Sequence, residues 1–423
     1  YGGYGIGRTS SLSREETLSR LPGVKAEGLM GGVQFYDGQF DDARLTVALM
    51  RTAYNLGATP LNYMPVVGIE RKGGWIQSVT AQDKETGEEF RIRTKMVFNA
   101  AGAWVDPIRR MVDPDASTLV RVSRGSHILL DKSFMPGDTG MLIPKTRDGR
   151  VLFAIPWHEM LLVGTTDVEQ REAEFDPKVS EEEVNFMIET ASGYLEKPIT
   201  RADVKATFAG LRPLFNPQAT GSAGSTAKVS REHAVIPEYG NMITVTGGKW
   251  TAYRKMAEHA MLEATQRHLI PARLCVTKDL PIFADQVWDQ AALEVAAEKS
   301  EEADAKVVEY ARYSREYEGA RTAEDVLFRR LRLGQMNAER TEALLPKVRA
   351  VFEEASEPAG EAEEAVEPAP VEAATENTEE TSSKASKKRP LKQRLAEKCR
   401  KLKEETLTLY LSFFEIPWYK KIL

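Results

Sequence analysis

Apolar residues recur at helical spacing in the segment that begins at Asp41. Four apolar residues of the stretch DDARLTVALMRTAYNLGA fall three or four positions apart: Leu45, Leu49, Ala53 and Leu56. This spacing places them on one face of a helix, and Gly57 ends the pattern. We therefore predict a helix that runs from Asp41 to about Gly57.

After this helix the pattern changes to strands separated by turn residues. Apolar and β-branched residues gather in four places, around Val66, Ile76, Phe90 and Val97. The dipeptides Gly73-Gly74 and Thr86-Gly87 supply the turns expected of hairpins. A helix followed by several strands is typical of an α/β or α+β protein.

Short strands dominate the segment 120–250. We predict them at SHILLD, MLIPKT, VLFAIPW, LLVGTTD, AVIPEY and MITVTGG. A helix from Ser180 to Lys197 interrupts them, and Ser180 with Glu183 three residues later forms a capping-box signature. We expect the strands to form a mostly antiparallel sheet.

Beyond Pro281 the pattern is helical again. Three consecutive stretches carry apolar residues at helical spacing: WDQAALEVAAEKSEEADAKVVEYARYSREY, TAEDVLFRRLRLGQM and NAERTEALLPKVRAVFEE. Thr322 caps the second of them. The simplest interpretation is a small helical domain over residues 281–355, appended to the rest and without a catalytic role.

The composition is that of a globular protein with room for two or three domains. Hydrophobic residues are 42% and charged residues 28% of the 423, with a mean hydropathy of -0.39. No apolar run reaches the ~18 to 20 residues that a membrane span needs, and no signal peptide is visible. Cys275 and Cys399 fit neither metal nor redox spacing, so we expect no metal site and a reducing cytoplasm as the setting.

The net charge of -6 conceals two blocks near the carboxyl end. Residues 353–380 hold eleven Glu and no Lys or Arg, whereas residues 384–403 hold ten basic residues and one acidic residue. We predict a disordered linker, acidic and then basic, over 356–390. Residues 391–423 carry an apolar stripe on a helix whose first half is basic, which suits an anionic membrane, a docking partner or an ordinary surface helix.

The stretch TVTGGKWTAYRK places two glycines and a lysine after β-branched residues, as many phosphate-binding turns do. A P-loop needs a glycine five positions before Gly248, where this chain has Ile243. The stretch therefore predicts a strand, a Gly247-Gly248 turn and a helix that begins near Thr251. An anion can bind there, but the stretch alone does not identify it.

A second turn follows the predicted strand in MVFNAAGAWVD. Ala100, Ala101 and Gly102 have almost no side chain, so the backbone can approach a flat or phosphorylated ligand closely. A tight turn that packs a strand on a helix explains the same residues equally well.

Several cations and two histidines are candidates for chemistry. The cations stand at predicted strand ends or in loops: Arg212, Arg231, Lys249 and Arg254. A guanidinium can bind phosphate or carboxylate, although most arginines and lysines are solvated surface charges. Arg212 lies in the apolar stretch GLRPLFNP, so of these cations it fits the solvated surface role least. His127, after a Gly-Ser turn, and His158, in a hairpin, are candidate general bases or structural residues.

No nucleophile elbow and no HExxH motif occurs, so a hydrolase is not favoured. The order of the motifs instead resembles the FAD-dependent glycerol-3-phosphate dehydrogenases, which include quinone-linked enzymes and related oxidases. The motifs are GGVQFYDGQFDDARLTVALMRTAYNLGATPLNY, VFNAAGAWVD, RGSHILLD, VLFAIPW, LLVGTTDVE, FAGLRPL, VSREHAV and TGGKWTAYRKMAEHA. YEGARTAEDVLFRRLRLG resembles the carboxy-terminal domain of that family, so the resemblance covers about residues 1–355.

The resemblance implies a D-amino-acid-oxidase-type flavoprotein that oxidises sn-glycerol 3-phosphate to dihydroxyacetone phosphate. It implies hydride transfer to FAD and then electron transfer to a membrane quinone or to oxygen, with peripheral membrane association and a homodimer as further expectations. It assigns Arg212 and Arg231 to the phosphate, Lys249 to the substrate and flavin oxygens, and His127 to the C2 hydroxyl proton. The residues implied to line FAD are Ala101, Gly102, Trp104, Gly247, Gly248 and Thr251.

Two departures qualify the resemblance. Members of the family begin with a strand, a GxGxxG turn and a helix, and this chain has no GxGxxG; its opening YGGYGIG breaks the spacing. We therefore expect an amino-terminally truncated sequence, with an incomplete FAD-binding domain over 1–280 that interleaves with the substrate domain and binds FAD weakly or not at all. The final LKEETLTLYLSFFEIPWYKKIL resembles the start of small YkvA-like helical membrane proteins.

Two other functions compete with this expectation. One is a D-amino-acid-oxidase-type flavoenzyme that acts on an amine or amino acid, which needs a carboxylate site and no phosphate specificity. The other is a non-catalytic, membrane-tethered interaction protein in which the basic helix is the active part. We expect no nucleic-acid partner for any of them.

Overall fold

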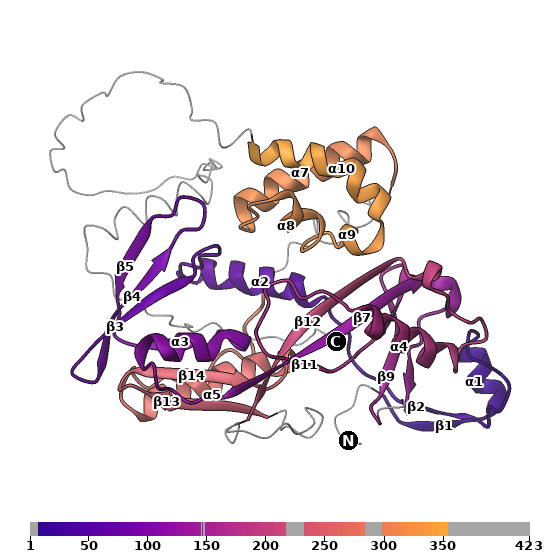
Figure 1. Cartoon of the computed structure of the whole chain (residues 1–423), viewed down its shortest axis with the longest axis horizontal. Coiled ribbons are helices and arrows are strands. Elements are labelled where there is room, and N and C mark those ends of the chain that lie inside the picture. The colour runs from indigo at the N-terminus through magenta and orange to yellow at the C-terminus, as the bar shows by residue number, and fades with distance from the viewer. Residues whose placement is uncertain (1–6, 145, 147–148, 217–231, 284–297, 354–423) are drawn as a thin grey trace, which may run out of the picture.

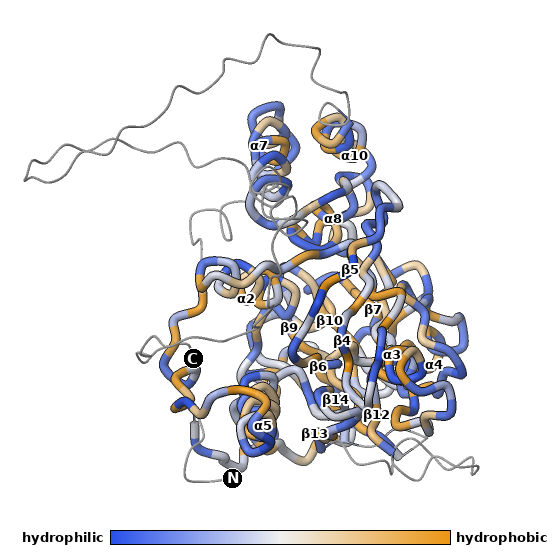
Figure 2. Tube along the Cα trace, turned by 90° about the vertical axis from the view of Figure 1, so that its left-hand side faces the viewer, coloured by the Kyte–Doolittle hydropathy of each residue, from blue (hydrophilic) through white to orange (hydrophobic). Residues whose placement is uncertain are grey.

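The structure, a computed structural model, describes residues 7–144, 146, 149–216, 232–283 and 298–353. Strands form most of a large body, and a set of helices lies above α2 (Asp42–Asn55) in both views (Figures 1 and 2). This set comprises α7 (Glu301–Tyr317), α8 (Ala323–Leu327), α9 (Leu333–Met336) and α10 (Ala338–Glu353). The α/β and α+β character with a carboxy-terminal helical region is confirmed.

The largest sheet is built around one long strand, β7 (Val120–Asp131). Three strands pair with it antiparallel: β10 (Met160–Gly164), β11 (Val168–Gln170) and β12 (Ala206–Phe215). The sheet continues from β10 through β9 (Leu152–Trp157) and β8 (Met141–Ile143), again antiparallel. The prediction of a mostly antiparallel sheet over this segment is confirmed.

The main core lies between this sheet and α4 (Glu181–Ser192). Side chains from both elements are almost fully buried there, among them Ile128, Leu130, Leu161, Val184, Met187 and Ala191. Burial of each large aliphatic side chain stabilises the fold by about 1.5–3 kcal/mol. The capping box predicted for this helix is present, since Ser180 and Glu183 exchange hydrogen bonds between their side chains and backbone amides.

A second sheet brings two distant turns together. β6 (Val97–Asn99) and β14 (Met242–Gly247) run parallel, and β13 (His233–Glu238) pairs antiparallel with β14. Parallel strands end at the same edge, so the turn after β6 and the Gly247-Gly248 turn meet there. α5 (Tyr253–Gln266) packs on this sheet through Ala260 and Ala264.

The remaining elements frame these two sheets. They are β1 (Ser10–Leu12), α1 (Arg14–Arg20), β2 (Gly32–Gln34), β3 (Val66–Lys72), β4 (Trp75–Gln82), β5 (Glu89–Arg93) and α3 (Val105–Val112). The predicted helix after Asp41 and the hairpins that follow it are confirmed as α2 and β3–β5. Buried Arg109 anchors α3, because its guanidinium binds Glu238 of β13 at 2.7 Å and Asp106 at 2.9 Å.

Three local predictions are wrong. α4 ends at Ser192 and not at Lys197, because Gly193 ends the helix and Leu195 forms a β-bridge with Val24. The helix predicted over TAEDVLFRRLRLGQM is two short helices, because the backbone of Arg332 adopts the left-handed conformation with φ of 59° between them.

The third error concerns the residues before His127. Gly125 and Ser126 do not form a turn; they lie inside β7, where they pair with Gly210 and Ala209 of β12. The absence of a side chain at Gly125 leaves room there for the guanidinium of Arg212. The acidic linker, the basic amphipathic helix and the start of the helix predicted from 288 lie outside the described residues.

An ion cluster joins α2 to the helical set. The buried carboxylate of Glu318 receives hydrogen bonds from Arg44 at 2.9 and 3.1 Å, from Ser314 at 3.1 Å and from Tyr310 at 3.2 Å. Burial alone would raise the pKa of Glu318, but the hydrogen bonds and charge of Arg44 and the charge of Arg330 hold that pKa below its ordinary value. The ionised carboxylate therefore ties the helical set to the body.

None of the helices in the described part of the chain is long and apolar enough to span a bilayer.

Glu318→Gln is expected to lower the free energy of unfolding by about 3–5 kcal/mol, because a neutral amide removes the negative charge that buried Arg330 and partly buried Arg44 share. Glu302→Gln is the matched control, since it removes the same charge from α7 at a solvent-exposed pair with Lys306. Urea unfolding of both variants measures the difference. Equal midpoints would show that the cluster does not stabilise the fold.

Candidate active site

A cavity of about 1220 Å³ lies among β7, β12, the ends of β6 and β14, α5 and α9. Its volume exceeds the ~300–1,000 Å³ typical of small-molecule pockets, so it can hold two ligands or one large one. One wall is apolar and is formed by Phe98, Val245, Tyr253, Met256, Ala257, Ala260 and Met261. The polar side chains include those of His127 and Arg212 on the strands opposite and of Lys249 in the turn before α5.

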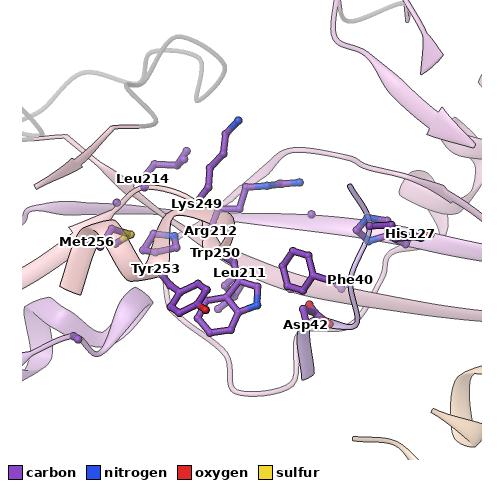
Figure 3. A pocket seen from close by; sticks show the side chains of 18 of the residues that line it. Phe40, Asp42, His127, Leu211, Arg212, Leu214, Lys249, Trp250, Tyr253 and Met256 are labelled. Carbon is purple, nitrogen blue, oxygen red and sulfur yellow. The ribbon is translucent and has the colours of Figure 1, made fainter. Parts of the chain in front are cut away.

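The pairing of β7 with β12 brings His127 and Arg212 to the same face of the large sheet. In this register His127 lies opposite Phe208, and Gly125 lies opposite Gly210. Side chains alternate between faces along a strand, so Phe208, Gly210 and Arg212 share the face that carries Gly125 and His127. Both predicted site residues line the cavity (Figure 3).

The guanidinium of Arg212 lies across β7 at Gly125. A Cβ at this position would overlap the guanidinium group, so a larger residue there would force the end of the Arg212 side chain to move. Arg212 donates to the carbonyl oxygen of Thr166 at 3.0 Å and to Oγ1 of Thr165 at 2.8 Å. A cation held in this way is oriented in advance for an oxyanion.

The imidazole of His127 is held between Phe208 and Gly164. Its ring stacks on Phe208 with centroids 5.0 Å apart, and a Cβ at Gly164 would overlap it from the other side. Its Nδ1 atom is buried and has no hydrogen-bond partner among the residues described. Burial and the positive charge of Arg212 lower the pKa of His127 to about 4, so the ring is neutral at neutral pH and able to accept a proton.

The turn after β14 places Gly247, Gly248 and Lys249 at the cavity. Both glycines adopt left-handed conformations, with φ of 71° and 73°, which two consecutive L residues adopt only with strain. A short 3-10 helix, η5 (Trp250–Ala252), leads from the turn into α5. In the view of Figure 3, Lys249 and Arg212 lie between His127 and Met256.

The other predicted site residues lie elsewhere. Ala101 packs beside Val105, and Gly102 and Trp104 form a 3-10 helix (Gly102–Trp104) beyond the cavity-lining residue Ala100. Thr251 is exposed in η5 and is not among the residues that line the cavity. Arg231 lies outside the described residues, so its role, like those of the others, stays a prediction. His158 occupies the β9–β10 turn, 4.0 Å from Asp41.

Several cavity residues were missed by the sequence predictions. Arg332 and Gln335, from the helical set, line the cavity, and Arg332 also binds Asp41 and Asp42 at 2.8 and 2.9 Å. No sequence signal pointed to them. Thr165 and Thr166, which hold Arg212 but are not among the residues that line the cavity, were also missed, although they lie within the quoted motif LLVGTTDVE as two adjacent hydroxyl residues after a strand. No cluster of three or more metal-ligating side chains occurs in the described part of the chain.

Comparisons with known proteins identify the family. A model of the FAD dependent oxidoreductases (DAO) matches residues 2–254, more than half of the chain. The chain therefore belongs to the FAD dependent oxidoreductase family. This match includes β7, β12 and the Gly247-Gly248 turn, and so nearly all of the strands that form the cavity.

Within this family, the chain is similar to glycerol-3-phosphate dehydrogenases. The mitochondrial enzyme of Arabidopsis thaliana is 36% identical over 295 residues, which cover 68% of this chain and 46% of the relative. The mitochondrial enzyme of Homo sapiens is 35% identical over 285 residues, which cover 66% of this chain and 39% of the relative. The chain thus spans less than half the length of these two relatives.

A solved structure matches a larger share of the chain. The glycerol-3-phosphate dehydrogenase from Bacillus halodurans, complexed with FAD, superposes with a TM-score of 0.66 at 26% identity. The superposition covers 82% of this chain and 76% of that chain. This share is larger than the segment matched by the family model, which ends at residue 254.

Gly125→Ala is expected to destabilise the protein by about 1–3 kcal/mol, because the added methyl group displaces the guanidinium of Arg212. Gly210→Ala, at the paired position on β12, is the control, since a Cβ there meets nothing within 4 Å. It should leave stability unchanged or raise it by up to about 1 kcal/mol. Thermal unfolding of both variants checks the prediction, which equal melting temperatures would contradict.

His127 is expected to remain neutral from pH 8 down to about pH 5 in the folded protein, as followed by the chemical shift of its Hε1 proton. In the unfolded chain a histidine takes up its proton near pH ~6.5. Because the unfolded state then binds more protons than the folded state, this residue makes the fold less stable as the pH falls from ~6.5 towards 4. His127→Asn should reduce the slope of stability against pH in that window, and a titration midpoint near 6.5 in the folded protein would refute the assignment.

Proposed function

We propose that this chain forms the substrate side of an enzyme that oxidises sn-glycerol 3-phosphate to dihydroxyacetone phosphate with FAD as its cofactor. The observation that carries the proposal is the joint placement of Arg212, Lys249 and a neutral His127 on one cavity with an apolar wall. The similarity to glycerol-3-phosphate dehydrogenases supports the substrate.

The residues of the cavity fit FAD. The Gly247-Gly248 turn gives a large ligand access to the backbone, and the apolar wall along α5 suits a flat aromatic ring. FAD, when bound, supplies the hydride acceptor for the oxidation. Gly247, Gly248, Tyr253 and Met256 are the described residues that we assign to holding it.

The cations of the cavity fit the phosphate of the substrate. Arg212 is fixed by Thr165 and Thr166, and Lys249 adds a second positive charge at the same cavity. Two cations match a phosphate dianion in charge, and a planar guanidinium matches two of its oxygens in shape. Arg231 is the third phosphate ligand in this proposal.

Neutral His127 is the base of the proposed reaction. Its low pKa keeps the imidazole unprotonated at neutral pH, so a ring nitrogen can accept the proton of the C2 hydroxyl group. The same positive charge on Arg212 that lowers the pKa also attracts the anionic substrate. The site therefore combines phosphate binding with a base that stays available.

The wider setting of the enzyme is part of the proposal. We assign the electron acceptor to a membrane quinone, reached by peripheral association of a homodimer with the membrane. Residues 281–355 are proposed as a separate helical domain, which the buried cluster shared by α7, α8 and α10 supports. Residues 356–390 are proposed as a linker and 391–423 as a basic membrane-contacting helix.

Calorimetry of the chain with sn-glycerol 3-phosphate tests the site without relying on tight FAD binding. We expect saturable binding of glycerol 3-phosphate and none of glycerol, because the phosphate supplies the charge that the cations recognise. Arg212→Gln should weaken binding at least about tenfold, as loss of a charge-assisted hydrogen bond predicts. Arg201→Gln, which alters an exposed ion pair with Glu181, is the control and should bind as the parent does.

Reconstitution with excess FAD tests the reaction class. Anaerobic addition of glycerol 3-phosphate should bleach the flavin absorption band, whereas glycine or D-alanine should not. Bleaching by an amino acid alone would favour the amine-oxidising alternative. Absence of both binding and bleaching would count against the proposed function.

A further inference from the structure

A buried carboxylate lies behind the cavity, outside the residues assigned to the reaction. Glu183, in the first turn of α4, is 5% exposed. Its Oε1 atom accepts hydrogen bonds from Oγ of Ser126 and from Oγ1 of Thr166, both at 2.7 Å. One oxygen therefore joins the central strand β7 to the segment that follows β10.

The second oxygen of Glu183 is also engaged. Oε2 accepts a hydrogen bond from the backbone amide of Ser180 at 3.0 Å and pairs with Arg124 at 2.7 Å. Burial would raise the pKa of Glu183, but hydrogen bonds from Thr166, Ser180 and Ser126 and the charge of Arg124 outweigh it and lower that pKa. The carboxylate is thus ionised, and its charge is balanced by an adjacent arginine.

These contacts lead directly to Arg212 and His127, which line the cavity. Thr166 accepts a hydrogen bond from the amide of Ser126 at 2.9 Å through Oγ1, and its carbonyl oxygen accepts one from Arg212 at 3.0 Å. Ser126 stands between Gly125, which the guanidinium of Arg212 crosses, and His127. The carboxylate of Glu183 therefore fixes the two segments that contact the guanidinium of Arg212. One is β7 at Gly125 and Ser126, and the other is the chain at Thr166.

We propose that Glu183 is a positioning residue that sets the orientation of Arg212 and His127 through Thr166 and Ser126. The inference rests on the proposed function, in which Arg212 binds the substrate phosphate. Because Arg124 balances the charge of Glu183, the carboxylate orders the segment without adding net repulsion to an anionic ligand. A neutral hydroxyl or amide acceptor in its place would not accept all four contacts.

Glu183→Gln tests the proposal in the full chain. The amide keeps the shape of the carboxylate but has one acceptor oxygen, so it cannot serve Ser180, Ser126 and Thr166 together and it presents a donor to Arg124. We expect the dissociation constant for sn-glycerol 3-phosphate, measured by calorimetry, to rise about tenfold as Arg212 loses its orientation. Glu181→Gln, two residues earlier in α4 and exposed, should leave the dissociation constant within about twofold.

A double-mutant cycle separates positioning from general stability. If Glu183 acts through Arg212, adding Glu183→Gln to the Arg212→Gln variant should cause no further loss of affinity. A general structural effect would weaken binding by the same factor in both backgrounds, and that result would overturn the proposal. Unchanged affinity in the single variant would overturn it as well.

Hydrogen exchange distinguishes failure of this inference from failure of the proposed function. Glu183→Gln should speed exchange of the Ser126 amide and of the segment 164–167, and Glu181→Gln should not. If the parent chain binds no glycerol 3-phosphate, the proposed function fails, and the exchange result alone decides whether Glu183 holds the segment. Equal exchange in both variants would refute its positioning role.

Discussion

The antiparallel register between β7 and β12 is the constraint on which the site depends. It sets His127 opposite Phe208 and Gly125 opposite Gly210, and so places Arg212 on the cavity face. A slip of one residue would turn every side chain of one strand to the opposite face and separate the histidine from the arginine. The core between this sheet and α4 resists such a slip, because the alternate residues Ile128 and Leu130 are fully buried in it.

Ionised groups are buried at the joints between elements. Arg109 joins α3 to β13, Glu183 joins α4 to β7, and Glu318 joins the helical set to α2. Each is paired with an opposite charge and hydrogen-bonded, as a buried charge requires. Apolar packing stabilises each layer, and these polar contacts define how the layers meet around the cavity.

Local patterns in the sequence predicted the helices and strands well, but they predicted less well which of these elements contact one another. The helix α2 and the hairpins β3–β5 follow from spacing and turn residues within one segment. Arg212 stood out because an arginine in an apolar stretch needs a partner. Its partners, Thr165 and Thr166, could not be predicted from spacing, since strand pairing brings them together. The helical set was expected to be an appendage, yet Arg332 and Gln335 line the cavity, which only the contact between α9 and the body reveals.

The space next to Gly125 is filled by the side chain of Arg212, which comes from another strand. The guanidinium of Arg212 occupies the volume that a Cβ at position 125 would need. The two positions are therefore coupled: a larger residue at position 125 would force the guanidinium away from Thr165 and Thr166, whereas a chain without the arginine would have room for that residue.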